Sequence, residues 1–290
     1  MEAVELAPGA FAVIGSRNEA SVANRGEVGN HGIIVGESGV LMINTGTSYA
    51  QGRRLLEIAR RVTDKPVVMA VITQPLPEFI LGAAVFADRG IPVLAHDDAA
   101  RLLAQRCEQC LERLRMLLGA DLMAGSRVVT PDRVIRDGQV IDLGRRQVEL
   151  IVPGWASAPG DLMLRDRATG VLFSGALVTE QRIPDIRDAR LDAWLGVLDE
   201  LSRERDTVVV PGYGEPLCAS AIALQRDYLH ALQAWVDAQL EAGASLHETT
   251  RDAIVAPAFT PYRNWAGFTT IHPRNVHRYY LQREARPFGQ

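Results

Sequence analysis

The stretch from Val40 to Thr73 constrains the fold most, because it predicts a strand, a helix and a second strand in succession. Val40 to Ile43 is a short β-type apolar run that follows a turn containing Gly36 and Gly39. Arg53 to Val62 then has apolar residues at helical spacing, and Pro66 to Thr73 is an apolar run of buried-strand length. Strand, helix and strand form a βαβ unit, so we expect a sheet with helices on its face.

The same alternation continues on both sides of this unit and predicts two βα halves. The first half holds a strand meander at Phe11–Asn44, a helical pattern at Glu78–Asp88, a strand at Ile91–Ala95 and a helix at Asp98–Leu118. The second half holds short strands within Arg127–Leu150, strands at Asp161–Arg165 and Val171–Phe173, a helix at Leu191–Arg203 and a strand at Val208–Val210. Two halves of similar order favour an α/β fold of two packed sheets between outer helices.

The end of the chain has a different pattern from the two halves. Cys218 to about Ala242 predicts one long amphipathic helix, with Leu224, Tyr228, Leu232 and Trp235 on one side. No low-complexity segment or linker divides the sequence. We therefore expect a single domain over residues 1–290, with a helical C-terminal extension from about residue 218 to 290.

Composition excludes several classes of function. The 290 residues are 47% hydrophobic, enough for one large core or two modest ones, and 31 Lys and Arg against 35 Asp and Glu give a charge of −4. This balance argues against nucleic acid as a partner, and no apolar run approaches the roughly 18 residues of a membrane span. The only lysine, Lys65, stands next to Pro66 in a predicted turn, so Schiff-base chemistry is not expected.

Features of the termini and cysteines bear on the compartment. Met1 is followed by polar residues rather than by a basic start and an apolar core, so the chain as written predicts a cytoplasmic protein. A mature periplasmic protein with an added Met has the same appearance, and that alternative stays open. The odd number of cysteines, Cys107, Cys110 and Cys218, argues against a complete disulfide framework and fits a reducing compartment.

Two patterns of potential metal or redox chemistry have simpler interpretations. Cys107-x-x-Cys110 lies within a predicted helix whose apolar stripe includes both residues, which favours structural cysteines. No second such pair is present to make a zinc site. The six histidines are scattered and form no H-x-H or H-E-x-x-H motif, so we expect ordinary surface or loop residues. There is also no G-x-S-x-G motif of a serine hydrolase.

Three loops nevertheless have the placement of a functional site. Thr73–Phe79 and Val210–Pro216 each follow a predicted buried strand, and Pro153–Asp161 is rich in Gly and Pro. Loops at strand ends are where α/β sheets carry functional groups. We therefore expect these three loops to converge on one cleft.

Short segments in these loops and strands carry a family likeness when taken in order. They are Val40–Gly46, Val71–Thr73 with Ile80–Ala83, Pro159–Asp161, Val171–Gly175, Val209–Gly212, and the tail from Tyr262–Trp265 through His272–Val276. In this order and at these distances the chain resembles the metallo-β-lactamase superfamily, and more narrowly its quinoprotein relay system zinc metallohydrolases. The resemblance covers nearly the whole chain. It implies an αββα sandwich of two mixed sheets flanked by helices, with the site at one edge between the sheets.

The resemblance also implies where zinc ligands would stand. In that family the loop after the buried strand carries H-x-H-x-D-H, because two zinc ions need imidazole and carboxylate donors. Matched residue by residue, this sequence has Gln74 and Leu76 for the first two histidines. Glu78 stands for the aspartate and Phe79 for the last histidine. Only one carboxylate of this motif remains.

The other ligand positions implied by the resemblance are also replaced. The histidine of the third loop falls on Ser157, or on Trp155 with a shifted alignment. The bridging aspartate after Gly175 is Ala176, and the final histidine of the P-G-H-G pattern is Tyr213. Even the aspartate usually found before Thr45 is Asn44.

These replacements predict that the ordinary binuclear zinc site does not assemble. Zinc needs three or four donors in fixed geometry, and Leu76, Phe79 and Ala176 carry none. The loop-shaping residues that match the family pattern are Gly46, Gly82, Gly160, Gly175, Pro211 and Gly212. A family scaffold whose ligands are replaced indicates a non-catalytic relative, so we expect no metal, no cofactor and no catalytic residue.

Three hypotheses of function follow, and fold likeness alone licenses none of them. The favoured one is a zinc-free pseudo-hydrolase that binds a small molecule or a protein in the former active-site cleft. The second is a hydrolase of the ester, thioester or lactone class, or a lyase, that uses Glu78, Asp161, Ser157 or Tyr213. The third is a structural or interaction protein whose cleft is filled. The oligomeric state stays open.

The expected cleft is apolar and walled by aromatic rings. Trp155, Phe79, Leu76 and Tyr213 come from three converging loops, and such side chains pack together or bind a ligand. Polar groups for orienting a ligand would come from Gln74, Ser157 and Glu78, with Trp155, Asp161 and Asn44 as further candidates for contact.

Overall fold

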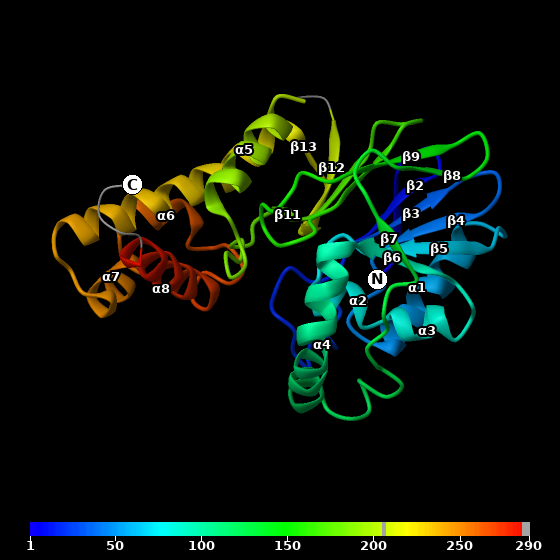
Figure 1. The fold of residues 1–290 in the computed structure, drawn as a ribbon, viewed down its shortest axis with the longest axis horizontal. Helices are drawn as coiled ribbons and strands as arrows, with labels where there is room; N and C mark the ends of the chain where they lie inside the picture. Colours follow the sequence, from blue (N-terminus) through cyan, green and yellow to red (C-terminus); the bar gives the residue numbers. More distant parts are fainter. Residues whose placement is uncertain (205–206, 286–290) are drawn as a thin grey trace.

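The computed structural model describes residues 1–204 and 207–285, and its first half is a seven-stranded sheet (Figure 1). Its strands lie in chain order: β1 (Ala3–Ala7), β2 (Ala10–Val13), β3 (His31–Val35), β4 (Val40–Ile43), β5 (Val67–Val71), β6 (Val93–His96) and β7 (Arg133–Ile135). Strands β1 to β4 pair antiparallel, and β4 to β7 pair parallel. The predicted βαβ unit is therefore the point at which the sheet changes from one mode of pairing to the other.

The second half forms a six-stranded sheet in the order β13-β12-β11-β10-β9-β8. Its strands are β8 (Val140–Asp142), β9 (Gln147–Ile151), β10 (Met163–Asp166), β11 (Leu172–Thr179), β12 (Val208–Tyr213) and β13 (Leu217–Cys218). Only β11 and β12 pair parallel in this sheet, as described, and the other neighbours pair antiparallel. Both sheets are thus mixed, as the resemblance implied.

Strand β4 shows how the layers form, because its side chains alternate between two cores. Val40 and Met42 join the core under the helices α1 (Tyr49–Val62), α3 (Ala83–Ala87) and α4 (Asp97–Leu118). Leu41 and Ile43 join the core between the sheets, with residues such as Leu150 and Phe173 of the second sheet. Burying both faces accounts for the continuous apolar run of this strand.

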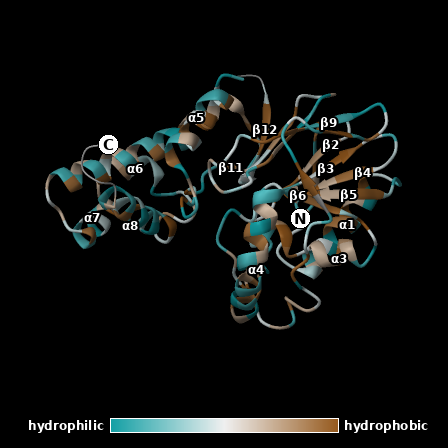
Figure 2. Cartoon of the chain, viewed as in Figure 1, coloured by the Kyte–Doolittle hydropathy of each residue, from teal (hydrophilic) through white to brown (hydrophobic). Residues whose placement is uncertain are grey.

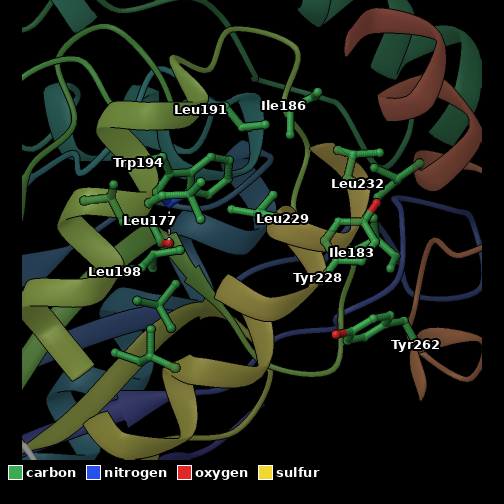
Figure 3. Close-up of a cluster of buried hydrophobic side chains, with 14 of the residues drawn as sticks. Leu177, Ile183, Ile186, Leu191, Trp194, Leu198, Tyr228, Leu229, Leu232 and Tyr262 are labelled. Carbon is green, nitrogen blue, oxygen red and sulfur yellow. Dashed lines mark hydrogen bonds between the residues drawn. The ribbon is translucent and has the colours of Figure 1, made fainter. Parts of the chain in front are cut away.

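A third core covers the outer face of the second sheet. The helices α5 (Leu191–Ser202) and α6 (Ala223–Glu241) pack there against residues of β11 and β12. Figure 3 shows Trp194 of α5 fully within this cluster, with its indole Nε1 donating a hydrogen bond to the carbonyl of Leu177 over 2.9 Å. Helix, sheet, sheet and helix make the αββα sandwich, which confirms the predicted fold class.

The C-terminal helices extend to one side of the sheets (Figure 1). They are η1 (Ala219–Ile222), α6, α7 (Leu246–Ala253), η2 (Pro257–Tyr262) and α8 (Ile271–Glu284); residues 286–290 of the expected extension lie outside the described residues. Figure 2 shows these helices alternating between hydrophobic and hydrophilic residues, as expected for helices that are buried on one face. Among the described residues, no helix combines the length and the apolar character needed to cross a lipid bilayer.

Two predicted helices differ in their bounds. The pattern at Glu78–Asp88 is divided into α2 (Pro77–Ile80) and α3, because Gly82 lies against the chain at Thr45, where a Cβ would come within 2.0 Å of the Thr45 carbonyl oxygen. The helix expected from Cys218 begins at Ala223, since Cys218 pairs with β12 as part of β13. Leu224, expected on its buried side, is 59% exposed.

The prediction that the histidines are surface or loop residues is wrong for two of them. His31 lies in β3 and is buried, with its Nε2 3.1 Å from the side-chain nitrogen of Gln51. His272 lies in α8 between the rings of Phe259 and Phe268, and its Nδ1 is 3.0 Å from the hydroxyl of Tyr228. Both are core residues with polar partners. Cys107 is buried in the core under α4, as expected, whereas Cys110 is only partly buried.

Candidate functional site

A cleft of about 140 Å³ lies at the edge of the sandwich where β5, β11 and β12 end. Its lining comes from the three predicted loops, from Ala176 and Thr179 of β11, and from residues 182–188, which follow β11. The lining residues are Gln74, Leu76, Pro77, Glu78, Ser157, Ala158, Ala176, Thr179, Arg182, Ile183, Asp185, Arg187, Asp188 and Tyr213. The expected convergence of the loops is therefore present.

Most residues at the inferred ligand positions line this cleft together. They are Gln74, Leu76, Glu78, Ser157, Ala176 and Tyr213. Phe79 is the exception, because it is fully buried beneath the cleft. Its ring stacks on Tyr213 with the centroids 5.9 Å apart, so it supports the cleft wall from behind.

Gln74 bridges two of the strand ends. Its Oε1 accepts a hydrogen bond from the backbone N–H of Ala176 over 2.8 Å. Gly175 leaves room for this contact: it has a φ of +52°, and a Cβ there would lie 2.1 Å from Oε1 of Gln74. The other end of the amide, Nε2, is buried and has no hydrogen-bond partner among the described residues. One buried donor beside the cleft is therefore left unpaired.

Tyr213 joins the Val210–Pro216 and Thr73–Phe79 loops through its side chain. Its hydroxyl donates a hydrogen bond to Oε1 of Glu78 over 2.6 Å. The guanidinium of Arg182 lies 4.1 Å from the centre of the Tyr213 ring, a cation–π contact. Burial, together with the nearby carboxylate of Glu78, raises the pKa of Tyr213 well above its usual range. The tyrosine therefore stays a neutral donor, and Glu78 is the acceptor.

Asp161 organises the Gly- and Pro-rich loop from inside. It is fully buried and accepts the backbone N–H groups of Ala156, Ser157 and Ala158 at 2.6–3.1 Å, and the hydroxyl of Ser157 at 2.6 Å. Burial raises the pKa of Asp161 to about 6, although these hydrogen bonds oppose the shift. Asp161 is therefore an anchor of the loop and does not line the cleft.

Asn44 also acts behind the cleft. With a φ of +61°, it adopts the left-handed conformation that Asn tolerates better than most residues. Its Oδ1 accepts hydrogen bonds from the backbone N–H and the hydroxyl of Thr73, both at 3.0 Å, and its Nδ2 donates to the carbonyl of Asn30. An aspartate could make only the first two bonds, because it lacks the donor. Asn44 thus fixes the end of β5 and is not among the cleft-lining residues.

The expectation that aromatic rings wall the cleft is wrong. Trp155 lies outside the cleft and is 41% exposed, with its Nε1 bonded to the carbonyl of Asp188 and the guanidinium of Arg190 stacked over its ring. Phe79 lies behind the wall, which leaves Tyr213 as the only aromatic residue in the described lining. Polar and charged side chains occupy the remaining space beside Leu76 and other small apolar groups.

The charged wall comes from the segment that sequence reasoning missed. Arg182, Asp185, Arg187 and Asp188 all follow the carboxyl end of β11. Arg187 pairs with Asp185 at 2.7 Å. Burial opposes ionisation of Asp185, but this guanidinium holds the pKa of the carboxyl below its usual range. The density of charged residues from Glu180 to Asp188 is the sequence signal that could have identified this segment.

The residues present do not fit a zinc centre. Within residues 1–204 and 207–285, no group of three or more His, Cys, Asp and Glu side chains is arranged to hold a metal ion. Leu76 and Ala176 face the cleft without a donor, and Glu78 already accepts from Tyr213. We therefore derive no chemical step through a metal at this position.

Comparison with known protein families agrees with the fold. The family model described as the metallo-beta-lactamase superfamily matches residues 24–213. The linear primary-alkylsulfatase of Pseudomonas sp. (strain ATCC 19151) is 21% identical over 292 residues, covering 86% of this chain and 55% of that protein. The chain thus spans about half the length of the curated relative it matches.

Solved structures support the same fold. The stereoselective inverting sec-alkylsulfatase Pisa1 from Pseudomonas sp. has a TM-score of 0.71 at 20% identity, covering 99% of this chain and 52% of that one. A metallo-beta-lactamase from Pontibacter korlensis has a TM-score of 0.64 at 19% identity, covering 79% of this chain and 98% of that one. At these identities the likeness shows the fold alone.

Proposed function

The chain belongs to the metallo-β-lactamase superfamily, and from that premise we propose that it is a zinc-free, non-catalytic member that binds a small ligand in its cleft. The observation that carries the proposal is the hydrogen-bonding at the inferred ligand positions. Glu78 is bonded to Tyr213, and Gln74 to the backbone of Ala176. Oε1 of Glu78 and Oε1 of Gln74, two oxygens at the inferred ligand positions, are thus engaged by donors of the chain itself.

The same contacts argue against a hydrolase that uses the surviving groups. Ser157 donates its hydroxyl hydrogen to Asp161, and no histidine stands among the described residues of the cleft lining to act as a base. Asp161 is surrounded by donors and does not reach the cleft. Glu78 shares one oxygen with Tyr213, so general-base help from it would be weak.

Ligand binding is favoured over a filled cleft by the free donor and the remaining volume. Nε2 of Gln74 is buried at a cleft wall without a partner, and leaving a buried donor unpaired costs about 1–3 kcal/mol. A ligand oxygen would satisfy it. Leu76, Ala176 and Ile183 offer apolar contact beside this donor. The expected ligand is therefore a small molecule with an acceptor oxygen and a partly apolar body.

Short alkyl sulfates are a reasonable first probe, because they combine acceptor oxygens with an apolar chain. The name of the curated relative refers to that class of compound. Titration of hexyl sulfate into the purified protein by calorimetry, with hexanol as the uncharged comparison, tests the proposal. Gln74→Glu keeps the acceptor for Ala176 and removes the free donor, so it should weaken binding about tenfold or more.

Two results would contradict the proposal. If Tyr213→Ala lowers stability and neither the wild type nor this variant binds hexyl sulfate or hexanol, side chains fill the cleft and it serves the structure alone. If hexyl sulfate is hydrolysed with turnover that disappears in Glu78→Gln, the chain is a hydrolase with a remodelled site. The narrower assignment to the quinoprotein relay group stays a prediction that rests on the order of the sequence motifs.

A further inference from the structure

A second and much larger hollow, of about 900 Å³, opens beside the cleft. We call it the arginine groove, after Arg106, Arg113, Arg187, Arg274 and Arg278, which line it. It lies between α4, the segment after β11, and the helices α7 and α8. In Figure 1, α8 lies to the left of α4.

The arginines form two rows on separate helices. Arg106 and Arg113 are seven residues apart on α4, which is about two helical turns, so both project from one face. Arg274 and Arg278 are four residues apart on α8, about one turn, and also share a face. All four side chains are exposed, and both rows line the same groove.

The charges of the groove are not balanced within it. Its described lining has five arginines against two aspartates, Asp185 and Asp188, an excess of three positive charges in a chain whose formal charge is −4. Both aspartates are already paired, Asp185 with Arg187 and Asp188 with Arg106. Like charges that face one another repel and raise the local potential, which attracts anions.

Two of the arginines have no counter-ion in the described part of the chain. Arg274 pairs with Glu19 at 2.7 Å, but neither Arg113 nor Arg278 has a carboxylate within 4.0 Å among the described residues. One of them stands on α4 and the other on α8. An anion with two charged groups could therefore engage both sides of the groove at once.

We propose that the arginine groove binds a small multivalent oxyanion, a compound with two or more phosphate or carboxylate groups. A guanidinium presents its donors in a planar fork that matches the oxygens of either group. The volume of the groove lies within the roughly 300–1,000 Å³ of typical small-molecule sites. The inference goes beyond ligand binding in the cleft and does not depend on it, although the two hollows share Asp185, Arg187 and Asp188.

Calorimetric titration at low ionic strength tests this site with three defined probes: tripolyphosphate, citrate and inorganic phosphate. We expect saturable binding of tripolyphosphate or citrate that is at least about tenfold tighter than binding of inorganic phosphate, because each of the former carries several anionic groups and inorganic phosphate carries one. Tightest binding of tripolyphosphate identifies phosphate as the chemistry, and tightest binding of citrate identifies carboxylate. Binding should weaken with added salt.

Variants locate the site. Arg113→Ala and Arg278→Ala should each weaken binding about tenfold, and the double variant should weaken it further. Arg60→Ala, which removes an exposed arginine from α1 far along the chain, is the matched control and should leave binding unchanged. Tyr213→Ala alters the cleft and should also leave tripolyphosphate binding unchanged, which separates this proposal from the previous one.

Three outcomes would overturn the proposal. The first is the absence of saturable binding of tripolyphosphate and citrate by a folded wild type. The second is binding that the double variant retains or that Arg60→Ala weakens equally. The third is tighter arginine-dependent binding of a single-stranded oligonucleotide than of either small anion, which would make the groove a nucleic-acid surface.

Discussion

The hydroxyl of Tyr213 donates a hydrogen bond to Oε1 of Glu78 over 2.6 Å, joining residues that are 135 positions apart in the chain. By the family resemblance, both stand where zinc ligands would be. Tyr213 stays protonated and neutral because its pKa is raised, and the carboxylate of Glu78 accepts the hydrogen bond of its hydroxyl. A metal ion at this place would have to compete with a bond that the two side chains make by themselves.

Loss of this bond should destabilise the fold measurably. Tyr213→Phe removes the hydroxyl but keeps the ring that contacts Phe79 and Arg182. We expect the free energy of unfolding to fall by about 1–2 kcal/mol, because a partly buried carboxylate loses its donor. Urea denaturation followed by circular dichroism measures this change.

Glu78→Gln is the matched control for that measurement. The amide oxygen of glutamine can still accept from Tyr213, so the loss should be smaller than for Tyr213→Phe. A loss for Tyr213→Phe no larger than that for Glu78→Gln would show that the 2.6 Å contact contributes nothing specific to stability.

We expect no stoichiometric zinc in protein purified without chelator. The reason is the lack of donors at Leu76, Phe79 and Ala176, which leaves too few ligands for the tetrahedral geometry of zinc. Elemental analysis measures the metal content, and neither zinc nor EDTA should shift the thermal midpoint. One or more zinc ions per chain, lost when Glu78 or Gln74 is substituted, would sink this prediction.

The protein should not accelerate the hydrolysis of β-lactams, lactones, thioesters, phosphodiesters or alkyl sulfates above the uncatalysed rate in buffer alone. The side chains of the cleft offer no activated water and no nucleophile paired with a base, since Ser157 is bonded to Asp161. Product assays with each substrate class measure this directly. Turnover that copurifies with the protein and is abolished by Glu78→Gln or Asp161→Asn would favour the hydrolase hypothesis.

The sequence predicts the fold well because periodicity reports burial. The run at β4 is buried on both faces, between α1 and the second sheet, and it appears as a continuous apolar segment. The boundary errors arise where a tertiary contact overrides the local pattern. The predicted helix is interrupted at Leu81 and Gly82, where the chain lies against Thr45, a closeness that periodicity does not encode.

The candidate site was predicted in position but not in character. The loop that follows β5 converges with the carboxyl end of β12, so Gln74, Glu78 and Tyr213 line one cleft. What no pattern could give is the direction of each side chain: Phe79 points beneath the wall, and Trp155 lies outside. The sequence around Arg187 is typical of a loop. That this loop lines the cleft depends on tertiary packing, which the local sequence pattern does not predict.

Acid should weaken the fold through two buried histidines. Burial lowers the pKa of His31 and of His272 from 6.5 to about 4. Below pH 6.5 the unfolded chain therefore takes up protons that the folded chain refuses, so stability present above pH 6.5 is lost as the pH falls toward 4. Each histidine accounts for about 3 kcal/mol over this range. His272→Phe, which keeps a ring between Phe259 and Phe268, should make the loss shallower.

Asp161 should act in the opposite direction over the same range. Its pKa is raised from 3.8 to about 6 by burial, so its contribution to stability is fully present below pH 3.8 and is lost as the pH rises through 6. In the wild type this gain on acidification offsets part of the loss from the histidines. Asp161→Asn removes the offset, so its free energy of unfolding should fall more steeply from pH 6.5 to 4 than that of the wild type, by about 3 kcal/mol. Urea titrations at several pH values give the slope of the free energy of unfolding against pH. A loss of stability that is the same at every pH leaves this slope unchanged. A slope equal to that of the wild type would mean that Asp161 has an ordinary pKa in the folded chain.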